Sequence, residues 1–123
     1  MIGPAELHAR FSALPGAALD HPFGPEVEVY KVGGKVFGWF VQDDAGLRVT
    51  LKGDPVLSEA LRAAHAAIRP GYHTDKRHWN TLHLDGSLKD GLVWQLLEAS
   101  YDLVRAKLAR TERAKLSAEA RGA

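Results

Sequence analysis

Residues 26–52 have the sequence EVEVYKVGGKVFGWFVQDDAGLRVTLK, in which short apolar runs alternate with turn-forming residues. Gly33-Gly34 provides two residues that tolerate positive φ, as a two-residue hairpin turn requires. The run from Asp43 to Gly46 predicts a second turn, because Asp and Gly favour turn conformations. The segment therefore predicts an antiparallel meander of three strands, at residues 26–32, 35–41 and 47–52.

Side chains along these strands are expected to alternate between the two faces of the sheet. In the first strand, the pattern predicts that Val27 and Val29 face a core while Glu28 and Tyr30 face outward. The third strand has an apolar and a polar set of residues, Leu47, Val49 and Leu51 against Arg48, Thr50 and Lys52. This pattern is typical of a sheet with one solvated face.

Helical patterns lie on both sides of the meander. Residues 5–14 have apolar positions at helical spacing and end at Pro15-Gly16. Residues 15–25 hold three prolines and two glycines, which predicts a connector without a regular element. After the meander, Asp54 before Pro55 predicts a helix start. That helix is expected to run to about Ala67, with a buried stripe at Leu57, Leu61, Ala64 and Ile68.

The C-terminal part predicts one more strand and a long helix. Residues 79–84 alternate, with Leu82 and Leu84 on one face and Trp79, Thr81 and His83 on the other. The segment from Ser87 to Asp90 has the form of a capping box, and a broad apolar stripe follows it to Leu108. Residues 109–123 are rich in alanine and charge, which is typical of a solvated helical extension or a tail.

These elements predict an α+β domain of two layers with the order α-β-β-β-α-β-α. The sheet is expected to be largely antiparallel, with the helices on one face. A chain of 123 residues fits one such domain. We expect that domain at residues 1–110, with 111–123 as a charged extension or tail.

Composition excludes several classes of function. The chain has no cysteine, which excludes a disulfide framework, a thiol nucleophile and cysteine metal sites. The longest apolar run, Val36 to Val41, is too short to cross a bilayer, and charged residues interrupt the first ten positions where a signal peptide would be apolar. We therefore expect a cytoplasmic protein with no membrane partner. The 16 basic and 15 acidic residues permit a polyanion partner without requiring one.

Residues 69–80, RPGYHTDKRHWN, combine aromatic rings, imidazoles and cations. A surface of this kind can contact phosphates through its cations and stack its rings on bases. Alternatively, Tyr72 and Trp79 pack at the sheet edge while Lys76 and Arg77 are solvated loop charges. The sequence leaves both interpretations open.

Other cations have similar double interpretations. Lys31 and Lys35 flank the Gly33-Gly34 turn, so the hairpin could follow a nucleic-acid backbone as a wing or protect a sheet edge. Arg48 and Lys52 could extend the same patch or solvate the sheet. The basic run from Arg105 to Lys115 could contact phosphates, but it also complements the negative end of the long helix, which favours the second interpretation because it needs no ligand.

No motif for catalysis or metal binding stands out. His73, His78 and His83 are five residues apart, but neither a cysteine nor an H-E-x-x-H motif accompanies them, which favours structural roles over zinc. A G-x-S-x-G elbow, a Walker loop and a dinucleotide fingerprint are all missing. We expect no metal, no cofactor and no enzymatic activity. Convergence of His73, His78 and Asp75 in a deep cleft would indicate otherwise.

Several short segments together resemble one family. They are LPG at 14–16, DHPFGP at 20–25, KVGGKVF at 31–37, PGYH at 70–73, KRHWNT at 76–81, LDG at 84–86 and SYDLV at 100–104. In order and spacing they resemble the bacterial MmcQ/YjbR family, with K-x-H-W-N and S-Y as the most specific elements. Two positions depart from the family pattern: Lys89 replaces a proline at the helix start, and Gly38-Trp39 replaces a smaller apolar pair.

This resemblance implies a CyaY-like fold and a DNA-binding role through a double-wing arrangement. Fold kinship does not carry over the iron binding of frataxin, because the first helix has only Glu6 as an acidic residue. We therefore predict a non-catalytic DNA-binding protein of low sequence specificity, since no helix presents base-reading side chains. The predicted contacts are Lys31, Lys35, Arg69, Tyr72, His73, Lys76, Arg77, His78, Trp79 and Asn80.

The competing hypothesis is a module that binds a small anionic ligand or a protein partner. In that case residues 72–80 would form one wall of a pocket and the Pro22-Phe23-Gly24 connector the other. Near-zero net charge favours this alternative.

Overall fold

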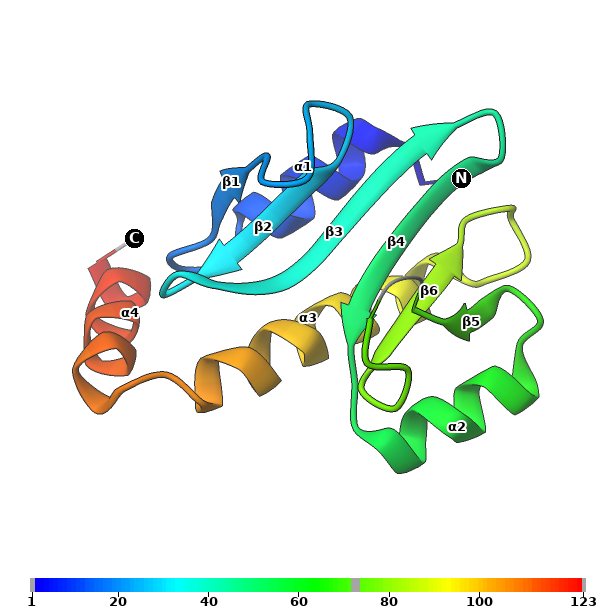
Figure 1. Cartoon of the computed structure of the whole chain (residues 1–123). Coiled ribbons are helices and arrows are strands. Elements are labelled where there is room, and N and C mark those ends of the chain that lie inside the picture. The colour runs from blue at the N-terminus through cyan, green and yellow to red at the C-terminus, as the bar shows by residue number, and fades with distance from the viewer. Residues whose placement is uncertain (1, 72–73, 123) are drawn as a thin grey trace.

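The computed structural model describes residues 2–71 and 74–122, which form an α+β fold (Figure 1). Its strands make one six-stranded antiparallel sheet with the order β1-β2-β3-β4-β6-β5. The elements in chain order are α1 (Pro4–Ser12), β1 (Ala18–Asp20), β2 (Glu28–Val32), β3 (Lys35–Asp43), β4 (Gly46–Lys52), α2 (Pro55–Ala64), β5 (Ile68–Pro70), β6 (Trp79–His83), α3 (Asp90–Ala106) and α4 (Arg110–Gly122).

Helices lie on one face of this sheet, as the sequence predicts. In Figure 1, α1 and α3 lie behind the strands and cross them obliquely. α3 contacts β2, β3 and β4. Among the described residues, no helix covers the opposite face of the sheet. Nor does any described helix have the length and apolar composition needed to cross a membrane.

Aromatic packing around Phe11 joins α1 to the sheet. The fully buried ring of Phe11 stacks on Tyr30 at 4.7 Å between centroids and contacts Phe37 and Phe40. Gly38 allows this close approach, because a Cβ at that position would lie 2.7 Å from the Phe11 ring. The core therefore requires a residue without a side chain at Gly38.

A β-bulge in β3 turns Phe37 into the same core. Tyr30 pairs with Gly38 and Lys31 pairs with Val36, so Phe37 is the extra residue. Strict alternation would place Phe37 on the face opposite Gly38, but the bulge lets its ring pack against Tyr101 at 5.3 Å. The faces predicted for the first strand were also wrong, because β2 is buried on both sides. Tyr30 faces α1, whereas Val29 lies in register with Trp39 and is nevertheless buried.

Ser100 fastens α3 to the sheet beside this bulge. The last residue pair between β3 and β4 is Gly38 with Leu51. The Ser100 hydroxyl, which is fully buried, donates to the Phe37 carbonyl oxygen and accepts from the Lys52 amide at 2.8 Å. Next to it, the Tyr101 hydroxyl donates to the Pro15 carbonyl oxygen at 2.6 Å. The S-Y element thus ties α3 to both central strands and to the end of the first helical segment.

Two short strands lie where the sequence predicts none. β1 falls inside the proline-rich connector and pairs with β2 through Leu19 and Tyr30. The prolines flank β1 rather than interrupt it, so its amides can still pair. β5 begins at Ile68, a residue that the sequence pattern assigns to a helix stripe, and pairs with Leu82 of β6.

The helix boundaries also differ from their predictions. α2 ends at Ala64, and Leu57, expected in the buried stripe, is 52% exposed. α3 begins at Asp90 after Lys89, with no side-chain cap. The predicted capping box does not form, because the Ser87 hydroxyl bonds to the Asp85 carboxylate at 2.6 Å instead.

Residues 110–122 form α4, and this helix is attached to the domain. Leu116 is 7% exposed and belongs to the hydrophobic core. A Cβ on Gly16 would lie 2.2 Å from the Leu116 side chain, so the two positions are in direct contact. The C-terminal segment is therefore a helix that packs on the turn after α1.

We predict that Ser100→Ala destabilises the fold by about 2 to 6 kcal/mol. The substitution leaves the Phe37 carbonyl and the Lys52 amide without a partner in a buried position, and each unpaired group costs about 1 to 3 kcal/mol. Chemical denaturation followed by circular dichroism measures the change.

Ser12→Ala is the matched control, because the Ser12 hydroxyl is exposed and bonds only to carbonyl oxygens of its own helix. That change should stay within about 0.5 kcal/mol of wild type. Equal stabilities for the two variants would show that Ser100 does not fasten α3.

Candidate functional site

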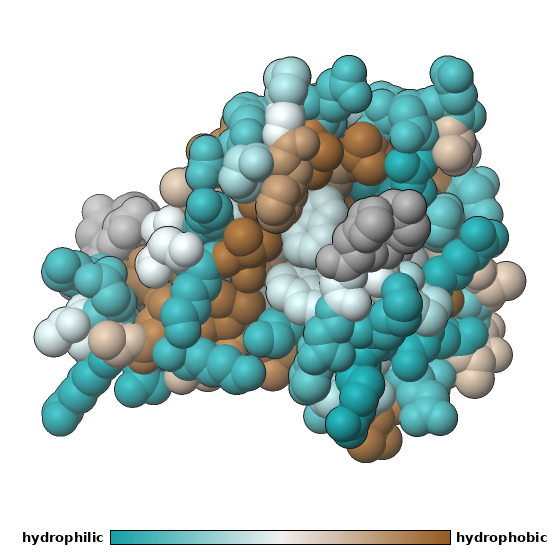
Figure 2. Space-filling view, in the orientation of Figure 1, coloured by the Kyte–Doolittle hydropathy of each residue, from teal (hydrophilic) through white to brown (hydrophobic). Residues whose placement is uncertain are grey.

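The helix-free side of the sheet presents a distinct set of side chains. The register places Trp39, Thr50 and Thr81 in one row, and Lys52 with Trp79 in the next. We call this surface the open face, and it comprises Trp39, Val41, Arg48, Thr50, Lys52, Arg69, Trp79, Thr81 and His83. Figure 2 shows this side of the molecule, where apolar and weakly polar residues form a band bordered by hydrophilic ones.

Two indole rings lie together on the open face. The ring centroids of Trp39 and Trp79 are 5.1 Å apart with a tilt of 39°. Phe23, from the connector between β1 and β2, contacts Trp39 edge-on and is 62% exposed. The three rings make a partly exposed aromatic surface that flat, unsaturated groups can stack on.

The polar groups beneath these rings are already satisfied. The hydroxyls of Thr50 and Thr81 hydrogen-bond to each other at 2.9 Å and are both buried. Among the described residues, no buried side-chain nitrogen or oxygen lacks a hydrogen-bond partner. The open face therefore offers ring faces and peripheral cations rather than an orphaned buried donor.

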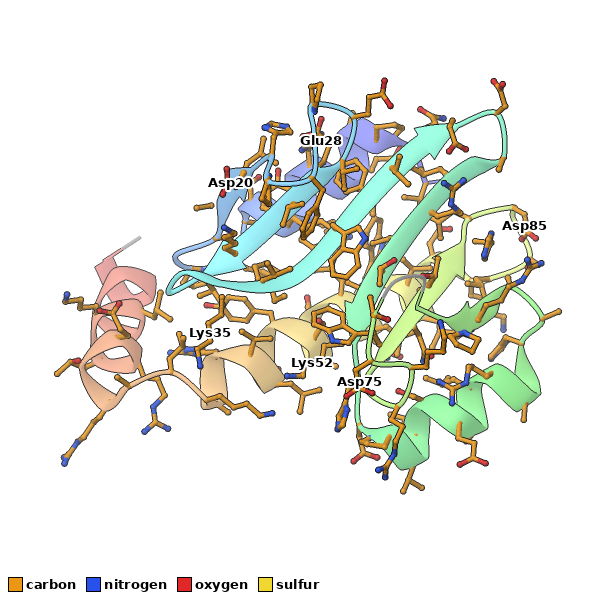
Figure 3. All side chains as sticks on the ribbon, viewed as in Figure 1. Asp20, Glu28, Lys35, Lys52, Asp75 and Asp85 are labelled. Atoms are coloured by element: carbon orange, nitrogen blue, oxygen red, sulfur yellow. The ribbon has the colours of Figure 1, made fainter. Side chains whose placement is uncertain are left out.

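Lys52 brings a cation to the aromatic surface. Its Nζ lies 6.0 Å from the centroid of the Trp79 ring. Burial lowers the pKa of Lys52, and the neighbouring Lys107 and Lys35 lower it further, while Asp75 acts in the opposite direction. We call Lys35, Lys52 and Lys107 the lysine cluster. Figure 3 shows Lys35 and Lys52 projecting on the same side, beside α3.

Arg48, another cation of the open face, has a carboxylate partner. Arg48 makes two hydrogen bonds with Asp43, at 2.7 and 2.8 Å, and this pairing lowers the pKa of Asp43 to about 2. His83 has a lowered pKa, first because of burial and then because of Arg69 and Arg48. His83 is thus favoured in its neutral form on the open face.

The predicted basic hairpin is only partly available to a ligand. Lys31 pairs with Asp20 at 2.9 Å, whereas Lys35 is exposed and belongs to the lysine cluster. The turn has Gly33 at φ +56° and Gly34 at φ +79°, as its sequence predicts. A Cβ on Gly33 would lie 2.7 Å from Leu108, so the tip of the hairpin packs on the end of α3 and does not project freely.

Most of the predicted residues in the loop before β6 form hydrogen bonds within that loop. Lys76 Nζ donates to the Gly71 carbonyl oxygen at 3.2 Å. His78 Nδ1 bonds to the Asp75 carboxylate at 2.7 Å, and the Arg77 amide donates to the same side chain at 3.0 Å. Two predicted residues, Tyr72 and His73, lie outside the described residues.

Asn80 is a buried residue on the helix side of the sheet. It lies in register with Leu51, on the face opposite Trp79. Its Oδ1 accepts from the Arg62 guanidinium at 2.8 Å, and the same group donates to the Lys76 carbonyl oxygen at 3.1 Å. This geometry makes Asn80 a link between α2 and the loop, with no free polar atom toward the open face.

Besides Lys35 of the lysine cluster, two predicted residues remain on or near the open face. Trp79 is half-buried there and faces Lys52. Arg69 is exposed and lies in register with Thr81 at the β5 edge. By contrast, the exposed Arg77 lies beside Pro55 and Val56 of α2, outside the open face.

Sequence reasoning missed Trp39 as a site residue, and it assigned Lys107 to the basic run at the helix end rather than to the predicted contacts. The alternation of β4 and β6 could have found Lys52 and Trp79 together, since it predicts both on the polar face. Trp39 follows the bulge, which a strict alternation does not anticipate. Lys107 reaches the site only because α3 ends at the hairpin tip.

A cavity of about 360 Å³ lies between α2 and α3, away from the open face. Its walls are mainly apolar side chains, including Leu57, Leu61, Leu96 and Leu103. The anticipated pocket between residues 72–80 and the connector involves positions beyond the described residues. Within the described part of the chain, no three His, Cys, Asp or Glu side chains gather as a metal site would need.

The sequence of this chain is similar to known proteins and to one protein family. The YjbR family model matches residues 12–103. The uncharacterized protein YbdF of Escherichia coli O157:H7 is 34% identical over 99 residues, covering 80% of this chain and 81% of that protein. The uncharacterized protein YjbR of Escherichia coli strain K12 is 49% identical over 53 residues, covering 43% of this chain and 45% of that protein.

Solved structures agree with the sequence comparison. The crystal structure of Deinococcus radiodurans protein DR2400, a DUF419 domain, superposes with a TM-score of 0.86 and 37% identity, covering 92% of this chain and 86% of that one. A Pseudomonas syringae protein at 24% identity shares the fold with a TM-score of 0.74. The segments from Leu14 to Val104 that resemble the family lie almost wholly within the matched range, and the chain is a member of the YjbR family.

Proposed function

We propose that this protein is a non-catalytic, cytoplasmic DNA-binding protein of low sequence specificity that uses the open face. The observation that carries the proposal is the Trp39–Trp79 pair on the helix-free face of the sheet, with Lys52 against Trp79. Stacking surfaces next to cations are the usual means of holding nucleic acid without reading its sequence.

This geometry favours a single strand over a duplex. Bases stack on exposed rings only when they are unpaired, whereas a duplex presents mainly phosphates and groove edges. A sheet also lacks the protruding helix that enters a major groove. We therefore expect binding to single-stranded DNA to be tighter than binding to duplex of the same length.

The contact set in this proposal differs from the one predicted from sequence. Lys35, Arg69 and Trp79 are kept, and Trp39 and Lys52 are added. Lys31 and Asn80 are left out because Asp20 and Arg62 engage their side chains. The hairpin packs on Leu108, so the proposed interface is the sheet surface rather than a pair of projecting wings.

Replacement of either open-face indole should weaken binding to a labelled single strand. Trp39→Ala and Trp79→Ala each remove one stacking surface, which contributes about 1 to 3 kcal/mol per base. We expect the dissociation constant to rise between about fivefold and about 150-fold, as measured by fluorescence anisotropy.

Trp94 provides the matched control for this experiment. It is a half-buried tryptophan on α3 whose ring packs under Arg10, remote from the open face. Trp94→Phe should bind like wild type, and its remaining indole fluorescence should be quenched by the strand. Unchanged affinity in both open-face variants would rule out the proposed interface.

Binding should also depend on salt in a defined way. With about three phosphates neutralised by the cations of this surface, log affinity for a single strand should fall with log salt at a slope near −2. Titrations at several salt concentrations measure the slope. A slope near zero would mean that no phosphates are neutralised and would contradict this mode of binding.

A further inference from the structure

Three lysines from separate elements meet at one end of the sheet. Lys35 is the first residue of β3, Lys52 is the last of β4, and Lys107 is the C-cap of α3. Two contacts bring these elements together. Gly33 packs on Leu108, and the Lys52 amide donates to Ser100 of α3.

In the described part of the chain, no carboxylate forms an ion pair with this cluster. Among the described residues, none lies within ion-pair distance of Lys35, Lys52 or Lys107, whereas Lys31, Arg48 and Lys115 have Asp20, Asp43 and Glu112. The charge of Asp75 acts on Lys52 and favours its charged form. The Asp75 side chain is engaged by His78 at 2.7 Å.

The end of α3 accounts for only part of this arrangement. The negative end of a helix dipole favours a cation at the C-cap, which explains Lys107. Lys35 and Lys52 come from strands, and the charges of both Lys35 and Lys107 act on Lys52. Like charges that converge cost free energy unless an anion balances them.

We propose that Lys35, Lys52 and Lys107 form a binding site for a phosphate group. Ammonium groups bind phosphate oxygens through charge-assisted hydrogen bonds, and three of them match a group that carries more than one negative charge at neutral pH. Trp79 lies beside Lys52 and can stack on a base attached to that phosphate. The stacking of a base on Trp79 rests on the proposed function. The binding of the phosphate group is inferred from the three lysines alone.

Methionine substitutions test the site, because methionine keeps much of the apolar stem of lysine and removes its charge. The probes are inorganic phosphate, a 5′-phosphorylated single strand, and the same strand without the terminal phosphate. Each of Lys35→Met, Lys52→Met and Lys107→Met should weaken phosphate binding about fivefold, and the triple variant should abolish it. Binding is followed by nuclear magnetic resonance titration.

Lys115→Met is the control for net charge, since Lys115 is exposed on α4 and pairs with Glu112 at 3.6 Å. It should bind phosphate like wild type. The triple variant should unfold at no lower temperature than wild type, because its substitutions relieve repulsion. Weakening by Lys115→Met equal to that of the cluster variants would overturn the site in favour of a general charge effect.

The three probes separate this inference from the proposed function. If both strands bind but the triple variant binds them as wild type does, the phosphate site is wrong and Lys35 and Lys52 are not contacts, while DNA binding through Trp39 and Trp79 stands. If inorganic phosphate binds and neither strand does, the phosphate site is supported and the proposed function fails.

The two strands also show which phosphate the site binds. If the terminal phosphate tightens binding by the wild type but not by the triple variant, the site binds a strand end. Equal weakening of both strands in the triple variant assigns it to the backbone.

Proton linkage gives an independent prediction. Burial, Lys107 and Lys35 hold the pKa of Lys52 below 10.5 in the free protein. Bound phosphate favours the charged form, so it should raise this pKa, and phosphate affinity should decrease as pH rises through it. Titration of the Lys52 ε-methylene signal with and without phosphate measures the change. A pKa unaltered by saturating phosphate would contradict the site.

Discussion

The hydroxyl of Ser100 occupies the point where the two central strands separate, and most of the architecture depends on it. At this point the β3 bulge interrupts regular pairing, so the Phe37 carbonyl and the Lys52 amide need a partner from elsewhere. Ser100 satisfies both from α3. Its two hydrogen bonds fix the helix against the sheet, keep Phe37 in the core and hold the end of β4 where Lys52 emerges.

This bulge also explains why the two sheet faces differ. Because Phe37 is turned inward, one face collects the core rings of Phe11, Tyr30, Phe37 and Phe40 under the helices. The other face keeps Trp39 and Trp79, where Phe23 of the connector contacts Trp39 and Lys52 lies over the Trp79 ring. Large rings left without a covering helix are the feature that most often marks a contact surface. The asymmetry of the sheet and its candidate site therefore have the same structural origin.

Sequence periodicity predicted those elements whose two faces differ in polarity. β4 and β6 alternate strictly, so their faces, and with them the positions of Lys52 and Trp79, follow from the pattern. β2 is buried on both sides, so alternation carried no information and the faces of Val29 and Tyr30 were predicted in reverse. The lysine cluster could not be predicted from the sequence, for another reason. It depends on a contact between Gly33 and Leu108, residues distant in sequence.

The family motifs turn out to describe the loop more than the surface. In the segment KRHWN, Lys76 and Asn80 bond to Gly71 and Arg62, and His78 bonds to Asp75, so three motif residues shape the loop and Trp79 alone reaches the open face. Lys107 lies beyond residues 12–103, which the family model matches. A phosphate site that needs Lys107 would then belong to chains that carry a cation after α3, rather than to every protein with this fold. The fold can thus be shared while the chemistry at its edge differs.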